Sequence, residues 1–154
     1  MMGLLREDIV QEARRWLGTP YRSRHYPVMG QACDCASFLL GVGLGAGVFA
    51  PGTRMPVYAA DRHLHRSDEA YREQLRAHGF VEIAPANAQL GDVLLLVMGQ
   101  HQPASHTAIV TDCNDAPTRI VHASRPVGRV CEHGIDARWR GRVRFAFRFP
   151  GIDA

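Results

Sequence analysis

The apolar residues of this chain follow different patterns before and after Pro85. Before it, apolar residues recur at helical spacing from Ile9 to Leu17, and the segment from Cys35 to Leu44 is apolar on nearly every side. After it, short alternating or continuously apolar runs predict strands at 93–98, 106–111, 119–123, 128–131 and 142–149. Helices followed by a meander of strands predict an α+β domain, with the helices packed on one face of an antiparallel sheet of about five strands.

The helical half has two further features. Ser67 is a suitable N-cap for a third helix, on the surface, which ends near Gly79. The buried helix has a glycine at every second position from Gly41 to Gly47, and each glycine in a helix interior costs about 1 kcal/mol relative to alanine. We expect close packing against neighbouring backbone to compensate for this cost.

Length and composition fit a single domain spanning all 154 residues, of which 46% are hydrophobic and 21% charged. No apolar run approaches the roughly 18 residues needed to span a membrane, and charges follow the N-terminus too closely for a signal peptide. We therefore expect a protein that is made in the cytoplasm and is not stably inserted in a membrane. The net charge of +3 is too small and too scattered to indicate a nucleic-acid partner.

Cys35 lies where a loop containing Gly30 runs into the apolar helix. In the first turn, a thiol lies among backbone N–H groups without intrahelical partners and at the positive end of the helix dipole. Both effects favour the thiolate, and beside a histidine such a cysteine can have a pKa well below its usual value of about 8.5. We therefore expect Cys35 to be a nucleophile; the alternative is a small buried hydrophobic residue.

A nucleophilic cysteine needs a base and a group that orients the base. His106 opens one predicted strand and His122 lies inside the next, so the two rings can lie side by side on one sheet face. If the face that His106 shares with Ala108, and His122 with Ile120, packs on the helix of Cys35, the three side chains converge. We expect His106 to be the base and His122 its orienting partner; the alternative is two structural histidines.

The remaining histidines are placed in loops or on surface helices, without a catalytic role; they are His25, His63, His65, His78, His101 and His133. Thiol chemistry requires no metal and no cofactor, so none is expected. The four cysteines show no C-x-x-C spacing and are expected to be free thiols, although a disulfide between Cys113 and Cys131 cannot be deduced or dismissed from the sequence.

Five short motifs follow one another along the chain: Gly18-Thr19-Pro20-Tyr21, Gly30…Asp34-Cys35, Gly91-Asp92-Val93, Ser105-His106-Thr107-Ala108-Ile109 and Val121-His122-Ala123. Their order and spacing resemble the NlpC-type cell-wall peptidases, which have a papain-like fold. Thr19-Pro20-Tyr21-Arg22, Cys33-Asp34-Cys35 and the Trp- and Arg-rich end through Pro150 resemble the short version encoded with bacteriophage tail genes. The resemblance extends from about Ile9 to Pro150.

The resemblance implies a catalytic set of Cys35, His106 and His122, with the backbone N–H of Cys35 in an oxyanion hole. It also implies a substrate-binding set of Tyr21, Asp34 and Ser105. For Tyr21 the alternative is an ordinary half-buried aromatic residue, and for Asp34 a helix N-cap.

Two positions depart from the family pattern. Ser37 stands where the family usually has a glycine, and the loop 22–31 is not the common tail-peptidase version. A side chain at Ser37 either crowds the packing behind the cysteine or is harmless. The altered loop leaves the substrate preference open.

The function that the resemblance implies is a cysteine peptidase that cleaves peptidoglycan stem peptides, as part of a phage tail and with tail-tip or baseplate proteins as partners. One alternative is a structural tail-tip or baseplate protein that keeps the fold with little or no activity. A second is a thioester-forming amidase or acyltransferase that uses the same three residues.

Overall fold

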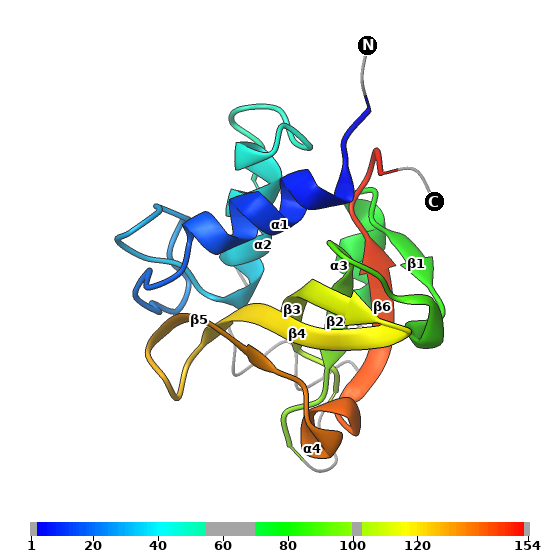
Figure 1. The fold of residues 1–154 in the computed structure, drawn as a ribbon. Coiled ribbons are helices and arrows are strands. Elements are labelled where there is room, and N and C mark those ends of the chain that lie inside the picture. The colour runs from blue at the N-terminus through cyan, green and yellow to red at the C-terminus, as the bar shows by residue number, and fades with distance from the viewer. Residues whose placement is uncertain (1–2, 55–69, 100–102, 153–154) are drawn as a thin grey trace.

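The computed structural model describes residues 3–54, 70–99 and 103–152 of the chain. The helices are α1 (Arg6–Arg15), α2 (Cys35–Gly45), α3 (Ala70–Ala77) and α4 (Ala137–Arg140), with a 3₁₀ turn at Pro85–Asn87. The strands are β1 (Val81–Ile83), β2 (Val93–Leu96), β3 (His106–Asn114), β4 (Ala116–Ser124), β5 (Arg129–Gly134) and β6 (Val143–Arg148). The predicted α+β class is confirmed (Figure 1).

The strands form one antiparallel sheet in the order β1-β6-β2-β3-β4-β5. β2 to β5 form the predicted meander, but β6 does not continue it. After β5 the chain turns through α4, and β6 returns to pair with β2, with Val93 opposite Phe147. β1 then pairs with the outer side of β6, which gives six strands instead of about five. β1 escaped prediction because three residues are too few to show a period of two.

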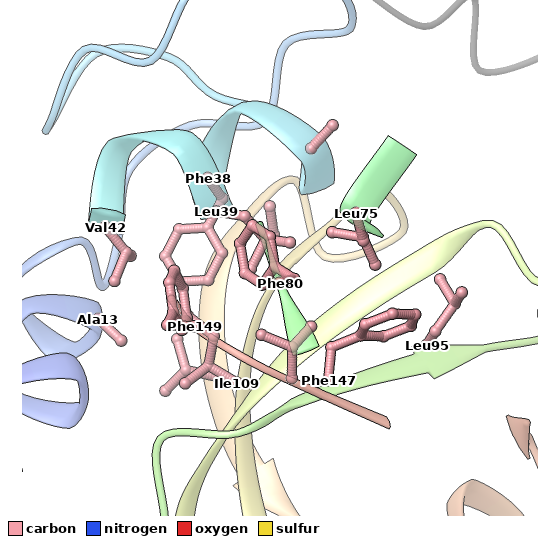
Figure 2. Packing of buried hydrophobic residues seen from close by; sticks show 14 of the residues in the cluster. Ala13, Phe38, Leu39, Val42, Leu75, Phe80, Leu95, Ile109, Phe147 and Phe149 are labelled. Atoms are coloured by element: carbon pink, nitrogen blue, oxygen red, sulfur yellow. The ribbon is translucent and has the colours of Figure 1, made fainter. Parts of the chain in front are cut away.

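The two faces of the sheet bury different clusters. One face packs against α1 and α2 and contains the side chains of Leu95, Ile109, Val121 and Phe147. Figure 2 shows Phe38, Leu39 and Val42 of α2 gathered near Ile109 and Phe149 in this cluster. The opposite face buries a second cluster that contains no residue of α2; its buried members are Ala88, Leu94, Leu96, Ala108, Val110, Ile120 and Ala146.

The assignment of the histidine face therefore has to be corrected. On a strand, residues two positions apart share a face. His106 is two residues from Ala108, and His122 is two residues from Ile120, so both rings belong to the face of the second cluster, not to the face that packs on α2. The predicted convergence through a shared helix-sheet face is wrong, and the two rings instead line one pocket together with Cys35, the first residue of α2.

Side chains, not backbone, occupy the space beside the glycines of α2. A Cβ atom on Gly41 would collide with the ring of Trp16, one on Gly43 with Phe49, and one on Gly45 with the carboxylate of Glu12. α1 and the loop after α2 thus approach α2 closely, as expected, but through their side chains.

α3 ends beside Gly79 (φ +87°), as predicted, whereas its proposed cap Ser67 lies outside the described residues. His63, His65 and His101 also lie outside them. None of the helices in the described ranges combines the length and the apolar character that crossing a bilayer requires.

Candidate active site

The local sequence places Cys35 at the first position of α2. Asp34 is the N-cap: its Oδ1 accepts a hydrogen bond from the backbone N–H of Ser37 at 2.8 Å. In return, Ser37 Oγ accepts one from the N–H of Asp34, also at 2.8 Å. Ser37 therefore completes a capping box, and its departure from the family glycine has a structural use. The second carboxylate oxygen of Asp34 accepts from the N–H of Arg24 at 2.8 Å.

Cys35 is partly exposed, and its thiol donates to the carbonyl oxygen of Ser105 at 3.8 Å. Thr107 Oγ1 donates to the Cys35 carbonyl at 3.2 Å and lies 3.3 Å from the hydroxyl of Tyr71. Desolvation, together with the smaller effect of the negative charge of Asp34, raises the pKa of the Cys35 thiol to about 12. Hydrogen bonds from Thr107, Tyr71 and Ala36 lower this pKa by less. The expected low pKa is thus wrong for this structure, because desolvation outweighs the helix terminus.

Three imidazoles form a hydrogen-bonded chain on the sheet. His106 Nε2 lies 2.8 Å from His122 Nδ1, and His122 Nε2 lies 2.8 Å from His133 Nε2. His133 Nδ1 lies 2.8 Å from the carbonyl oxygen of Gly134. Adjacent rings in the chain are nearly perpendicular, with interplanar angles of 84° and 81°.

Burial holds the first two imidazoles in their neutral form. It lowers the pKa of His106 to about 4, with Arg142 and then His133 acting electrostatically in the same direction. It lowers the pKa of His122 to about 3, with His106 and His133 adding to the effect. At neutral pH, both rings are therefore uncharged.

One pocket of about 750 Å³ is lined by all six predicted site residues. These are Tyr21, Asp34, Cys35, Ser105, His106 and His122. The phenol of Tyr21 is half-buried in the pocket wall. Burial raises its pKa to about 12, so the phenol is neutral. The structure brings the predicted residues together; their individual roles stay predictions.

Besides these six, the lining of the pocket includes Tyr71, His133, Trp139 and Arg142, which were not identified from the sequence. His133 was placed in a loop but lies in β5, opposite Ile120 of β4. Because Cys131 is opposite His122, a period of two places His133 on the same face. That alternation was the available signal, and it was overlooked because the fourth strand was predicted to end at residue 131.

All four cysteines are free thiols. Within residues 3–54, 70–99 and 103–152, no group of three or more His, Cys, Asp or Glu side chains is arranged to hold a metal ion.

No protein-family model and no curated protein matches the chain, whereas solved structures do. The NlpC/p60 domain of the peptidoglycan hydrolase SagA is 21% identical with a TM-score of 0.60, over 92% of this chain and 97% of that one. An NLP/P60 family protein from Staphylococcus aureus, described as similar to lipoprotein, is 22% identical with a TM-score of 0.59, over 94% of this chain and 41% of that one. The peptidoglycan hydrolase RipB of Mycobacterium tuberculosis is 18% identical with a TM-score of 0.58, over 94% and 64%. This chain therefore spans nearly all of the SagA domain but less than two thirds of the other two proteins, and it has the fold of the NlpC/p60 proteins.

Proposed function

We propose that this chain is a cysteine hydrolase that cleaves amide bonds in the stem peptides of peptidoglycan. The observation that carries the proposal is a single pocket in which the thiol at the head of α2 faces the same space as the His106–His122 pair. Two of the similar structures, SagA and RipB, are named as peptidoglycan hydrolases, which supports this substrate class.

The proposed reaction begins from a neutral thiol and a neutral imidazole. Nε2 of His106 is engaged with His122, so Nδ1 is the nitrogen that takes the proton of the Cys35 thiol. Because burial disfavours both charged forms, we expect the thiolate to form as Sγ attacks the amide carbonyl carbon, not as a stable resting state. The oxygen of the tetrahedral intermediate then lies near the N–H of Cys35, which belongs to the first turn of α2.

His106 next gives its proton to the leaving amine, and a thioester remains on Cys35. Water, activated by the same imidazole, hydrolyses the thioester and regenerates the thiol. We propose the γ-D-glutamyl bond to the diamino acid as the bond that is cut. The pocket wall carries charged groups of both signs, Asp34 on one hand and Arg125 and Arg142 on the other, which suits a stem peptide with free amino and carboxylate groups.

Incubation with purified muropeptides, followed by mass analysis, tests the proposal. We expect wild type to release fragments with a new free amine, and Cys35→Ala and His106→Ala to release none. Cys113→Ala is the matched control, because Cys113 is a free thiol that does not line this pocket. The proposal fails if wild type releases no such fragment, or if Cys35→Ala cleaves as fast as the control.

We also propose that the protein works in a phage tail and docks on tail-tip or baseplate proteins. The only support for this proposal is the set of sequence motifs that include Thr19, Tyr21 and Cys33. A purely structural role drew its support from Ser37 and the loop 22–31, but the capping box gives Ser37 a role in the helix that does not require activity to be lost. Mass spectrometry of purified particles tests the location, and the infectivity of particles carrying Cys35→Ala separates enzyme from structural component.

A further inference from the structure

We propose that His133 is a positioning residue which, through His122, fixes the tautomer of His106 and leaves Nδ1 of His106 as a proton acceptor. The inference rests on the proposed function for its consequence in catalysis. Its structural basis is the chain of three imidazoles that ends on the carbonyl oxygen of Gly134.

When all three imidazoles are neutral, the direction of each hydrogen bond between them follows from the last ring, His133. A carbonyl oxygen only accepts, so Nδ1 of His133 carries the hydrogen. A neutral imidazole has one N–H, so Nε2 of His133 accepts, and Nε2 of His122 is the donor to it. Nδ1 of His122 then accepts from Nε2–H of His106. The one remaining ring nitrogen, Nδ1 of His106, has a lone pair and no hydrogen.

This order matters because the pair His106–His122 alone does not determine it. Without a third partner, His122 has two neutral tautomers, and either one satisfies the bond to His106. If His122 carried its hydrogen on Nδ1, it would donate to Nε2 of His106, and the hydrogen of His106 would move to Nδ1. A thiol facing an N–H group has no base, so the second arrangement is inactive.

Packing holds His133 in place for this role. The register puts Cys131 opposite His122 and Ile120 opposite His133, so the two rings lie diagonally on adjacent strands. The ring of Trp139 covers both imidazoles, with centroids 5.2 Å and 4.8 Å away. These contacts keep His122 only 2% exposed, so water competes little for its Nε2.

Among the residues that the structure describes, the other polar groups near the three imidazoles do not reverse this donor–acceptor order. Cys131 Sγ lies 3.8 Å from His122 Nε2, where a thiol is a weak partner beside an imidazole nitrogen at 2.8 Å. The charged side chain that reaches His106 is Arg142, which stacks on Trp139 at 4.6 Å and opposes protonation of His106. Arg125 and the Cys35 thiol line the same pocket.

Two substitutions at one position separate tautomer control from simple packing. In His133→Gln, the side-chain oxygen can accept from Nε2–H of His122 and the amide N–H can donate to Gly134, so the order is kept. In His133→Phe, the ring still packs on Trp139 but makes neither bond. We expect kcat to fall about 100-fold in His133→Phe with little change in KM, and to stay within about threefold of wild type in His133→Gln. His78→Phe, at the end of α3 and outside the pocket, is the control.

The ¹⁵N chemical shifts of the imidazoles at pH 7 provide a readout that needs no substrate. We expect His106 to be protonated on Nε2 in wild type and His133→Gln, and to show the Nδ1–H tautomer in a large fraction of His133→Phe. If wild type does not cleave muropeptides, the proposed function is refuted, but the tautomer measurement still tests the role of His133. The inference is wrong if His106 has the same tautomer in all three proteins, or if His133→Gln is as impaired as His133→Phe while both remain folded.

Discussion

Cys35 and His106 are both uncharged at neutral pH, and burial is the main reason in each case. Desolvation raises the pKa of the thiol to about 12 and lowers that of the imidazole to about 4. A thiolate–imidazolium pair in the resting state would need both shifts to be overcome at once. Stabilisation of the charged groups must therefore occur in the transition state, when the proton moves to His106 and negative charge develops on the substrate oxygen.

The low pKa of His106 predicts an unusually acidic limit for activity. The base must be neutral to take the thiol proton, so kcat/KM should fall as the pH drops through about 4, instead of through the usual histidine value near 6.5. Arg142→Gln removes a positive charge that lowers this pKa, so the acidic limb should move to higher pH. The measurement is kcat/KM from pH 3.5 to 8, with circular dichroism at each pH to follow folding.

Arg138→Gln is the control for this prediction, because Arg138 lies on the neighbouring helix α4, is exposed and does not line the pocket. Its profile should match that of wild type. An acidic limb at pH 6.5 in wild type, or an unmoved limb in Arg142→Gln, would contradict the argument.

At the residue scale, the six candidates chosen from the sequence motifs line one pocket, while their roles stay predictions. The direction of the pKa shift of Cys35 was not accessible, because it depends on how much protein encloses the thiol. His133 was missed because its role arises from a cross-strand diagonal that involves three separate segments.

The glycines of α2 present a problem at the scale of the element. Alanine has the higher helix propensity by about 1 kcal/mol, so a glycine in the middle of a helix needs a reason to be there. At Gly41 the reason is the ring of Trp16, which is 4% exposed and packs edge-on against Phe38 at 6.2 Å. A rigid ring enclosed on both sides cannot move aside.

We therefore expect Gly41→Ala to lower the free energy of unfolding by up to about 2 kcal/mol, since an overpacking cost of about 1–3 kcal/mol is offset by only about 1 kcal/mol of helix propensity. Gly45→Ala is the matched comparison in the same helix. There the new Cβ meets the end of Glu12, a flexible side chain that can rotate, and the loss should be smaller. Urea unfolding at pH 7 measures the free energy of unfolding of both variants. Equal losses of stability, or a gain for Gly41→Ala, would show that the Trp16 ring moves aside.

The order of elements was predictable to the extent that neighbours in sequence are neighbours in space. β2 to β5 follow this rule, and the boundaries of α2 were predicted to within one residue. β6 breaks the rule: its alternation identified it as a strand but contained no information on its partner. Besides β1, it pairs with β2, whose four residues are all buried, so the backbone N–H and C=O groups of β2 need partners at both edges, which β3 and β6 provide.

At the scale of the whole molecule, one buried carboxylate joins the beginning, middle and end of the chain. Asp92 is 0% exposed and precedes β2. Its Oδ1 accepts from Arg6 of α1 at 3.0 Å, and both its oxygens accept from Arg148 of β6 at 3.0 Å. Nearby, Leu4 and Ile152 form a parallel bridge, so the two ends of the described chain lie together (Figure 1). The motif Gly91-Asp92-Val93 thus has a structural role and lies outside the pocket.

Asp92→Asn should be among the most destabilising single changes in the protein. Asparagine has almost the same shape, but it leaves two guanidinium groups, each at most 15% exposed, without a counter-charge. Breaking a buried ion pair by removing one partner costs about 3–5 kcal/mol, so urea unfolding should show a loss in this range. Glu82→Gln is the control, because that carboxylate pairs with Arg72 and Arg76 at a more exposed site, where ion pairs contribute about 0–1 kcal/mol. If the two substitutions cost the same, Asp92 does not join the three segments energetically. If Asp92→Asn is destabilised as expected yet cleaves muropeptides normally at a temperature where it is folded, the fold and the site depend on different residues.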